Sequence, residues 1–230
     1  MRDMKKILII FAISFVSCNR ETVEPVGLLS VSERMIDSYK VMTDLLFNFD
    51  QKTSSLQIYD DGTKWLYGAE RDEITKKYDD THYNKRLLPG TFEAFTNRFS
   101  GITVTSDRDF NEIPAGENLG DIIRIVAVSP LKWLDSHGTA TYNWDRLPPD
   151  YDLLFSKMTD SNLSSLYLEE ENHPVNKPLT ALTSEDLTLL NTHCIFLIFT
   201  ETPKKKAHRL TVSFKDEEGS ITSTKEVRFK

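Results

Sequence analysis

The sequence contains very little cysteine and no long apolar run, and each absence excludes a class of structure. Among its 230 residues only Cys18 and Cys194 are cysteines, so a framework of several disulfides is excluded. The apolar stretch at residues 7–16 is too short to cross a bilayer as a helix, which needs about 20 residues. The chain must therefore fold around an apolar core without disulfide support.

Motifs of common catalytic chemistry are also missing. The sequence has no GxSxG nucleophile elbow, no glycine-rich phosphate loop and no HExxH zinc motif. Asp135, Ser136 and His137 are residue types found in catalytic triads, but they are consecutive, whereas a triad is assembled from separate parts of a fold. From the sequence we assign no catalytic residue, no metal ligand and no cofactor.

Acidic residues outnumber basic residues in the chain. The chain has 28 Lys and Arg against 35 Asp and Glu, a formal net charge of −7. Binding to nucleic acid depends on basic side chains that neutralise phosphates. We therefore expect no nucleic-acid partner.

The N-terminus, in contrast, carries a clear pattern. Arg2, Lys5 and Lys6 precede the short apolar run, and a small residue, Ser17, follows it. This is the layout of a bacterial export signal. We expect cleavage between Ser17 and Cys18, which removes residues 1–17 and leaves a more acidic mature chain.

The end of this segment, Phe15-Val16-Ser17-Cys18, resembles the lipobox of bacterial lipoproteins. The resemblance implies that the Cys18 thiol receives a diacylglycerol and that its freed amine is acylated, and two or more acyl chains hold a protein stably at a membrane. Asn19 is compatible with delivery to the outer membrane, on either its periplasmic or its outer face. The alternative is a secretory signal that ends in a chance cysteine. Residues 18–28 are expected to be a tether.

The rest of the chain, residues 29–230, is expected to be one domain of mainly β structure. In its first two thirds and at residues 194–199 we predict strands over 39–49, after a short helical or irregular start, in the two arms of an Asp61-Gly62 hairpin over 56–67, and over 121–128 and 194–199. Residues 150–158 and 183–191 are predicted to be short helical segments, and residues 69–80 a surface helix or loop. Many short strands separated by turns predict an antiparallel β-sandwich with a few short helices.

The C-terminal third predicts the arrangement of the last strands. Leu210, Val212 and Phe214 alternate with polar residues, so their side chains should share one buried face. Strands near 195–199, 210–214 and 227–229 follow one another with short connections, which predicts an antiparallel meander. This pattern resembles the closing strands of immunoglobulin-like domains in bacterial surface proteins. The layout of the chain, with stretches such as SGITVTSDRDFNEIPAGENL, resembles small envelope lipoproteins of Bacteroidetes, which implies no activity.

Several polar groups resemble metal or calcium sites, and a solvated loop or turn is favoured for each. Asp107, Asp109 and Asn111 begin like a calcium loop, but Glu112 and Asn118 stand where an EF-hand needs Gly and Glu. The other two groups lack paired histidine spacing: Glu169, Glu170, Glu171 and His173, and Asp79, Asp80 and His82. Cys194, within an apolar run, is expected to be a buried, unreactive thiol.

Aromatic residues are the remaining candidates for ligand binding. They lie beside the Asp-Gly turn and around the LDSHGTA segment, where rigid rings near polar loops suit carbohydrate or peptide ligands. These candidates are Trp65, Tyr67, Trp133, Tyr142 and Trp144. The competing interpretation is that the rings fill the core.

We therefore expect a non-enzymatic outer-membrane lipoprotein that acts as a binding or structural module, with a glycan or an envelope protein as partner. The alternatives are a glycan-binding accessory lipoprotein and a surface hydrolase of a polymer or peptide, which would need two carboxylates facing one cleft.

Overall fold

The computed structural model describes residues 30–60, 62, 64–87, 92–143, 170–217 and 219–230. The predicted signal segment, Cys18, the tether and the predicted helix at 150–158 lie outside these residues. Among the described residues, the helices are all too short or too polar to cross a membrane.

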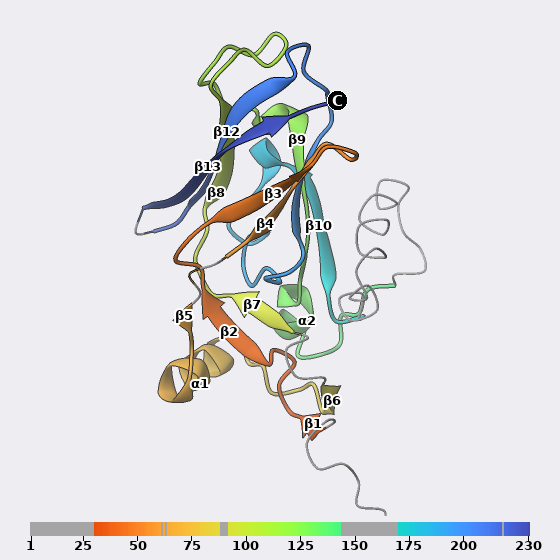
Figure 1. The fold of residues 1–230 in the computed structure, drawn as a ribbon. Helices are drawn as coiled ribbons and strands as arrows, with labels where there is room; N and C mark the ends of the chain where they lie inside the picture. Colours follow the sequence, from red (N-terminus) through yellow and green to blue (C-terminus); the bar gives the residue numbers. More distant parts are fainter. Residues whose placement is uncertain (1–29, 61, 63, 88–91, 144–169, 218) are drawn as a thin grey trace, which may run out of the picture.

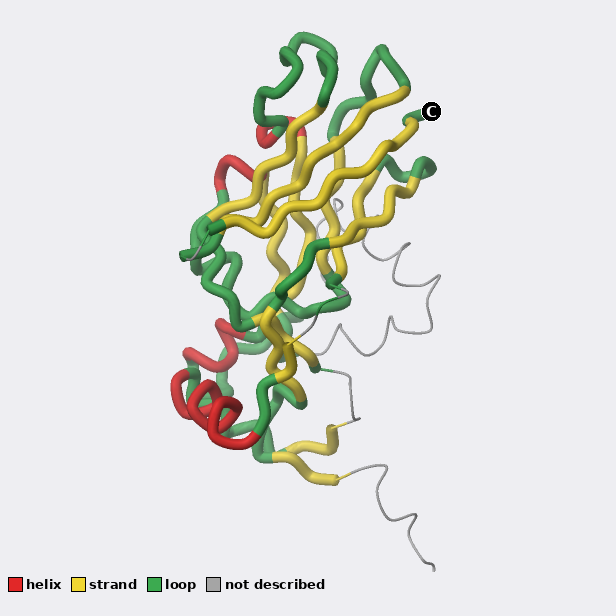
Figure 2. Tube along the Cα trace, turned by 60° about the vertical axis from the view of Figure 1, so that its left-hand side comes forward, coloured by secondary structure: helices red, strands yellow, loops and turns green. Residues whose placement is uncertain are grey.

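The structure is a mainly β protein whose larger part is a sandwich of two antiparallel sheets (Figures 1 and 2). One sheet has the order β10-β9-β11-β4-β3, with β3 at Leu46–Asp50, β4 at Ser55–Tyr59, β9 at Ile123–Ser129, β10 at His173–Pro178 and β11 at Ile195–Phe199. The other has the order β13-β12-β8, with β8 at Gly101–Ser106, β12 at Ala207–Lys215 and β13 at Ser220–Arg228. The main hydrophobic core contains side chains from both sheets.

The smaller part lies at the end of the molecule away from the C-terminus (Figure 1). Its sheet has the order β5-β2-β7, with β2 at Ser38–Val41, β5 at Lys64–Trp65 and β7 at Glu93–Phe95, and β2 runs parallel to β7. Helices α1 (Gly68–Lys77) and α2 (Leu131–Asp135) belong to this end, and a second hydrophobic cluster fills it. A two-stranded ribbon of β1 (Ser30–Ser32) and β6 (Lys85–Leu87) forms its tip, and two 3₁₀ turns, Gly120–Ile122 and Leu179–Ala181, complete the described elements.

The alternation predicted for β12 is confirmed. Leu210, Val212 and Phe214 are fully buried, whereas Thr211 and Ser213 on the opposite face are partly exposed. β13 pairs with β12 along its whole length and forms the edge of the sheet, as expected for the last strand.

The predicted meander of the last three strands is wrong, because β11 does not pair with β12. β11 lies between β9 and β4 in the five-stranded sheet. Its successive residues Ile195, Phe196 and Leu197 are all buried, so both of its faces are covered, and an interior position in the larger sheet provides that cover. The chain then crosses to the opposite sheet before β12.

The predicted Asp61-Gly62 hairpin is also wrong. β4 pairs with β3 and β11, while β5 pairs with β2 in the other part of the molecule. Gly62 serves a different purpose there, since a Cβ at this position would lie 2.8 Å from the Thr43 hydroxyl oxygen. The true β3–β4 hairpin turns through residues 51–54, where Ser54 adopts a positive φ of 48°.

Two further segments differ from expectation. The predicted continuous strand 39–49 is divided into β2 and β3, which belong to different sheets, and the link between them buries both Met42 and Leu45. Residues 184–189 form turns with i to i−3 hydrogen bonds, such as Leu187 N–H to Ser184 C=O at 3.2 Å, and no regular helix.

Phe229 should be a main contributor to sandwich stability. Its ring centroid lies 4.8 Å from that of Phe49 and 5.1 Å from that of Phe199, and the side chain is 1% exposed. We predict that Phe229→Ala lowers the free energy of unfolding by about 3–5 kcal/mol, because it leaves a cavity between the sheets. Urea unfolding should show this loss, and Ser220→Ala, at an exposed position of β13, should leave the midpoint nearly unchanged. Equal stability of the two variants would contradict the packing.

Candidate functional site

The candidate site begins at the C-terminus of α1. The N–H of Asp79 donates to the carbonyl of Lys76 (3.3 Å) and the N–H of Asp80 to that of Thr75 (3.0 Å), which is the Schellman pattern of helix termination. The residue that follows the C-cap in this motif takes a left-handed conformation and is usually Gly. Here it is Asp79, with a φ of 51°.

The C-terminus of α2 ends in the same way. The N–H of His137 donates to the carbonyl of Leu134 (2.9 Å), and the N–H of Gly138 donates to that of Trp133 (2.9 Å). His137, with a φ of 52°, holds the position that is usually Gly. Two helix ends of the same design thus each present a polar side chain in an uncommon backbone conformation.

Asp80 fixes the first of these helix ends against the rest of the smaller part. Its carboxylate is fully buried and accepts hydrogen bonds from the backbone N–H groups of Met35 (2.7 Å) and Ile36 (3.1 Å) and from the Tyr39 hydroxyl (2.8 Å). Burial raises the pKa of Asp80, and it also raises that of Tyr39. This buried group contradicts the expectation of a solvated loop at residues 79–82.

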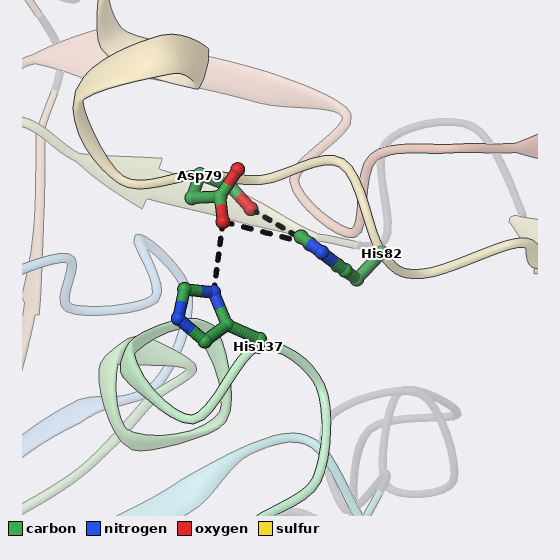
Figure 3. A group of neighbouring side chains, drawn as sticks. All are labelled: Asp79, His82 and His137. Atoms are coloured by element: carbon green, nitrogen blue, oxygen red, sulfur yellow. Dashed lines mark hydrogen bonds and ion pairs between the residues drawn. The ribbon is translucent and has the colours of Figure 1, made fainter.

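The fold brings Asp79, His82 and His137 together (Figure 3). His137 Nδ1 lies 2.8 Å and His82 Nδ1 3.8 Å from Asp79 Oδ2, and one ligand atom from each of the three residues lies within 4.8 Å of the others. The hydrogen bond from the His137 ring is the main cause that lowers the pKa of Asp79, so the carboxylate is ionised at neutral pH. Two imidazoles and a carboxylate in this arrangement are a donor set suited to a transition metal.

Trp133 lies beside this cluster, in the core of the smaller part. Its side chain is 3% exposed and belongs to the second hydrophobic cluster. A Cβ at Gly138 would lie 3.1 Å from the Trp133 ring and 3.4 Å from His82 Cβ, so glycine lets the α2 turn pack closely against both. Trp133 is therefore a core residue, which was the competing interpretation of the aromatic candidates.

The other aromatic candidates are spread over the molecule. Trp65 is 38% and Tyr67 69% exposed, and Lys40 Nζ lies 3.9 Å from the centroid of the Trp65 ring. Tyr142 is partly buried, with its ring centroid 5.8 Å from that of His173. Trp144 lies outside the described residues. Among the predicted rings, Trp65 and Tyr67 are therefore the two that the structure shows at the surface.

A buried ionic cluster centres on Glu93 of β7. Its carboxylate forms an ion pair with Lys40 of β2 and accepts hydrogen bonds from the Thr192 hydroxyl (3.2 Å) and His193 Nε2 (2.9 Å). Burial by itself would raise the pKa of Glu93, but the hydrogen bonds from His193 and Lys40 outweigh it and lower the pKa. No local sequence pattern predicts this cluster, because its members come from three separate segments.

The remaining sequence candidates have structural roles. In the 107–111 segment the Asp107 carboxylate accepts from the Arg209 N–H (2.8 Å), and that of Asp109 accepts from the Ala115 N–H (3.1 Å), which confirms a polar turn. Glu171, expected in a solvated loop, is fully buried and pairs with Lys85. Cys194 is buried as predicted, and burial raises the pKa of its thiol, which disfavours the reactive thiolate.

Comparisons with protein-family models, with curated proteins and with solved structures find no match to this chain. The candidate site is therefore defined by its own geometry.

Asp80→Ala should destabilise the smaller part of the molecule. The substitution leaves two buried N–H groups and one buried hydroxyl without their acceptor, and each unsatisfied donor costs about 1–3 kcal/mol. We expect the free energy of unfolding to fall by at least about 2 kcal/mol in urea titrations. Glu73→Ala, which removes an exposed carboxylate from α1, is the control and should be near neutral. A neutral Asp80→Ala variant would show that Asp80 does not anchor the helix end.

Glu93 should make stability depend on pH. Because its pKa in the folded protein lies below that of the unfolded chain, about 4.3, its contribution is present above that value and is lost as the pH falls through the lower folded pKa. We predict that Glu93→Gln costs about 3–5 kcal/mol at pH 7, since it leaves Lys40 without its buried partner. The difference from wild type should shrink below about pH 4.

The matched control is Glu217→Gln, which breaks an exposed ion pair with Arg98 and should cost at most about 1 kcal/mol. Chemical unfolding at pH 7 and at acid pH measures both variants. A cost for Glu93→Gln that stays constant with pH would contradict the ionic role.

Proposed function

We propose that this protein is a lipid-anchored module of the bacterial cell envelope, held at the outer membrane through Cys18. The observation that carries the proposal is the basic N-terminus, followed by a short apolar run that ends in Ser17-Cys18. Acylation at the thiol and at the freed amine of Cys18 would supply the chains that stable anchoring requires. The lipobox resemblance supports this reading over a plain secretory signal.

The domain suits attachment by its N-terminal end. The described chain begins at β1, at the tip of the smaller part, and the C-terminus lies at the opposite end of the molecule (Figure 1). The segment between Cys18 and Ser30 spans at most roughly 40 Å when fully extended. A tether at this end would hold the smaller part nearer the membrane and direct the sandwich away from it.

The proposed role is binding rather than catalysis, with a glycan or an envelope protein as partner. Exposed aromatic rings provide rigid contact area for such ligands, and Trp65 and Tyr67 supply it on and beside β5. The hydrolase alternative needs two carboxylates in one cleft. The buried carboxylates of Asp80, Glu93 and Glu171 each accept hydrogen bonds within the fold, which gives these three residues a structural role.

The test is Cys18→Ala, with Cys194→Ala as the matched control because Cys194 is the other cysteine of the chain. We expect wild type and Cys194→Ala to incorporate labelled palmitate in cells and to enter the detergent phase on partitioning. Cys18→Ala should incorporate no label and remain in the aqueous phase. Detergent partitioning of Cys18→Ala equal to that of wild type would show that the anchor is assigned wrongly.

A further inference from the structure

The geometry points to a binding site for a transition-metal ion, with Zn²⁺ as the best fit, formed by Asp79, His82 and His137. The inference concerns the described domain and does not depend on the lipid anchor. The ion would join the segment between α1 and β6 to the turn after α2 (Figure 3).

The distances are close to those that zinc requires. With zinc-to-ligand distances of about 2.0–2.1 Å and tetrahedral angles, neighbouring ligand atoms lie roughly 3.3 Å apart. Asp79 Oδ2 lies 2.8 Å from His137 Nδ1 and 3.8 Å from His82 Nδ1, values on either side of that separation. Small rotations of exposed side chains would therefore be enough to place all three around one ion.

The backbone positions two of the three side chains. Asp79 and His137 both occupy the left-handed position that ends a Schellman motif, where Gly is the usual residue because it lacks a Cβ. Asp and His are, with Asn, the non-Gly residues most enriched in this conformation. The two helix ends therefore terminate regularly and place a carboxylate oxygen and an imidazole nitrogen 2.8 Å apart.

The donor set and its surroundings define the class of ion. Imidazole nitrogen with one carboxylate suits Zn²⁺ and related transition metals, whereas Ca²⁺ and Mg²⁺ prefer sets made only of oxygen. The C-terminal end of α1 carries a partial negative charge, which also favours a cation. Three protein ligands leave a fourth position for water or an exchangeable ligand, as in zinc sites that are not purely structural.

The site is accessible to ions from solvent. The side chains of Asp79, His82 and His137 are 49%, 41% and 69% exposed, so loading requires no opening of the fold. The same exposure means that removing a histidine should leave the apoprotein folded, which makes the inference testable by substitution.

The competing explanation is a plain surface ion pair between Asp79 and His137. Such a pair needs only these two residues, and exposed pairs contribute little to stability. A metal site also needs His82, whose Nδ1 lies 3.8 Å from the Asp79 carboxylate and within hydrogen-bond distance of the Asp79 carbonyl (3.3 Å) and the Thr81 hydroxyl (3.2 Å). His82 therefore separates the two explanations.

The experiment titrates the purified full-length protein, solubilised in detergent and freed of metal with a chelator, with ZnCl₂ in a calorimeter. We expect one Zn²⁺ per chain and a higher melting temperature with zinc, since a ligand that binds only the folded state stabilises it. His82→Ala and His137→Ala should each weaken zinc binding at least about tenfold. CaCl₂ and MgCl₂ should give no saturable binding at the same concentrations.

The control is His193→Ala, which disrupts a histidine–carboxylate pair with Glu93 elsewhere in the molecule and should keep wild-type zinc affinity. Melting of each variant with chelator present checks that the fold is retained. Absence of saturable zinc binding by the wild type, or unchanged affinity in His82→Ala, would overturn the inference. So would an equal loss of affinity in His193→Ala, because zinc would then bind to histidines without regard to the cluster.

Discussion

The buried carboxylate of Asp80 is the interaction on which the candidate site depends. Taking a carboxylate out of water is unfavourable unless donors replace the lost hydration, and two backbone N–H groups and the Tyr39 hydroxyl do so here. These bonds join the end of α1 to residues 35–39, which are far away in sequence. Asp79 and His82 flank this anchor on either side, so their positions relative to α2 follow from it.

Glu93 plays a comparable part at the junction between the two hydrophobic clusters. β7 pairs with β2 in the smaller sheet, and the neighbouring residue Ala94 also forms a bridge with Asn191, just before β11 of the sandwich. The Glu93 carboxylate binds Lys40 of the smaller sheet, and it also binds Thr192 and His193, which lie just before β11 of the sandwich. A charged group thus connects the two parts where their apolar cores meet, and its hydrogen bonds give the junction a defined geometry.

The direction of side chains along a strand is set locally, whereas the partner of a strand is set by distant segments. Alternation along 210–214 identified the strand and its buried face, because side-chain direction in a strand follows from the backbone alone. The partner of a strand is a different matter: β11 was recognised as a strand, but its place between β9 and β4 depends on contacts with segments more than 60 residues earlier. The hairpin predicted from Asp61-Gly62 is wrong for the same reason, since a close contact with Thr43 can require Gly as well as a tight turn does.

The candidate site could be predicted only in pieces. Asp79, Asp80 and His82 stood out as a polar group and His137 as part of another, but nothing local relates residues that lie 55 positions apart. The two helix ends, at Tyr78-Asp79-Asp80 and Ser136-His137-Gly138, carry Asp79 and His137 in the left-handed conformation, which these residue types adopt more readily than most. This feature becomes visible only after the helix boundaries are known.

The edge position of β13 has a consequence for the behaviour of the protein at high local concentration. An edge strand exposes unpaired N–H and C=O groups that can recruit a strand from another molecule. In the second half of β13, Lys225, Glu226 and Arg228 would have to lose hydration before a foreign strand could pair. In the first half, short hydroxyl side chains at Ser220, Thr222 and Thr224 are exposed and offer an incoming strand little apolar surface to bury. The edge of the sheet is thus solvated along most of its length, which opposes self-association when the protein is concentrated.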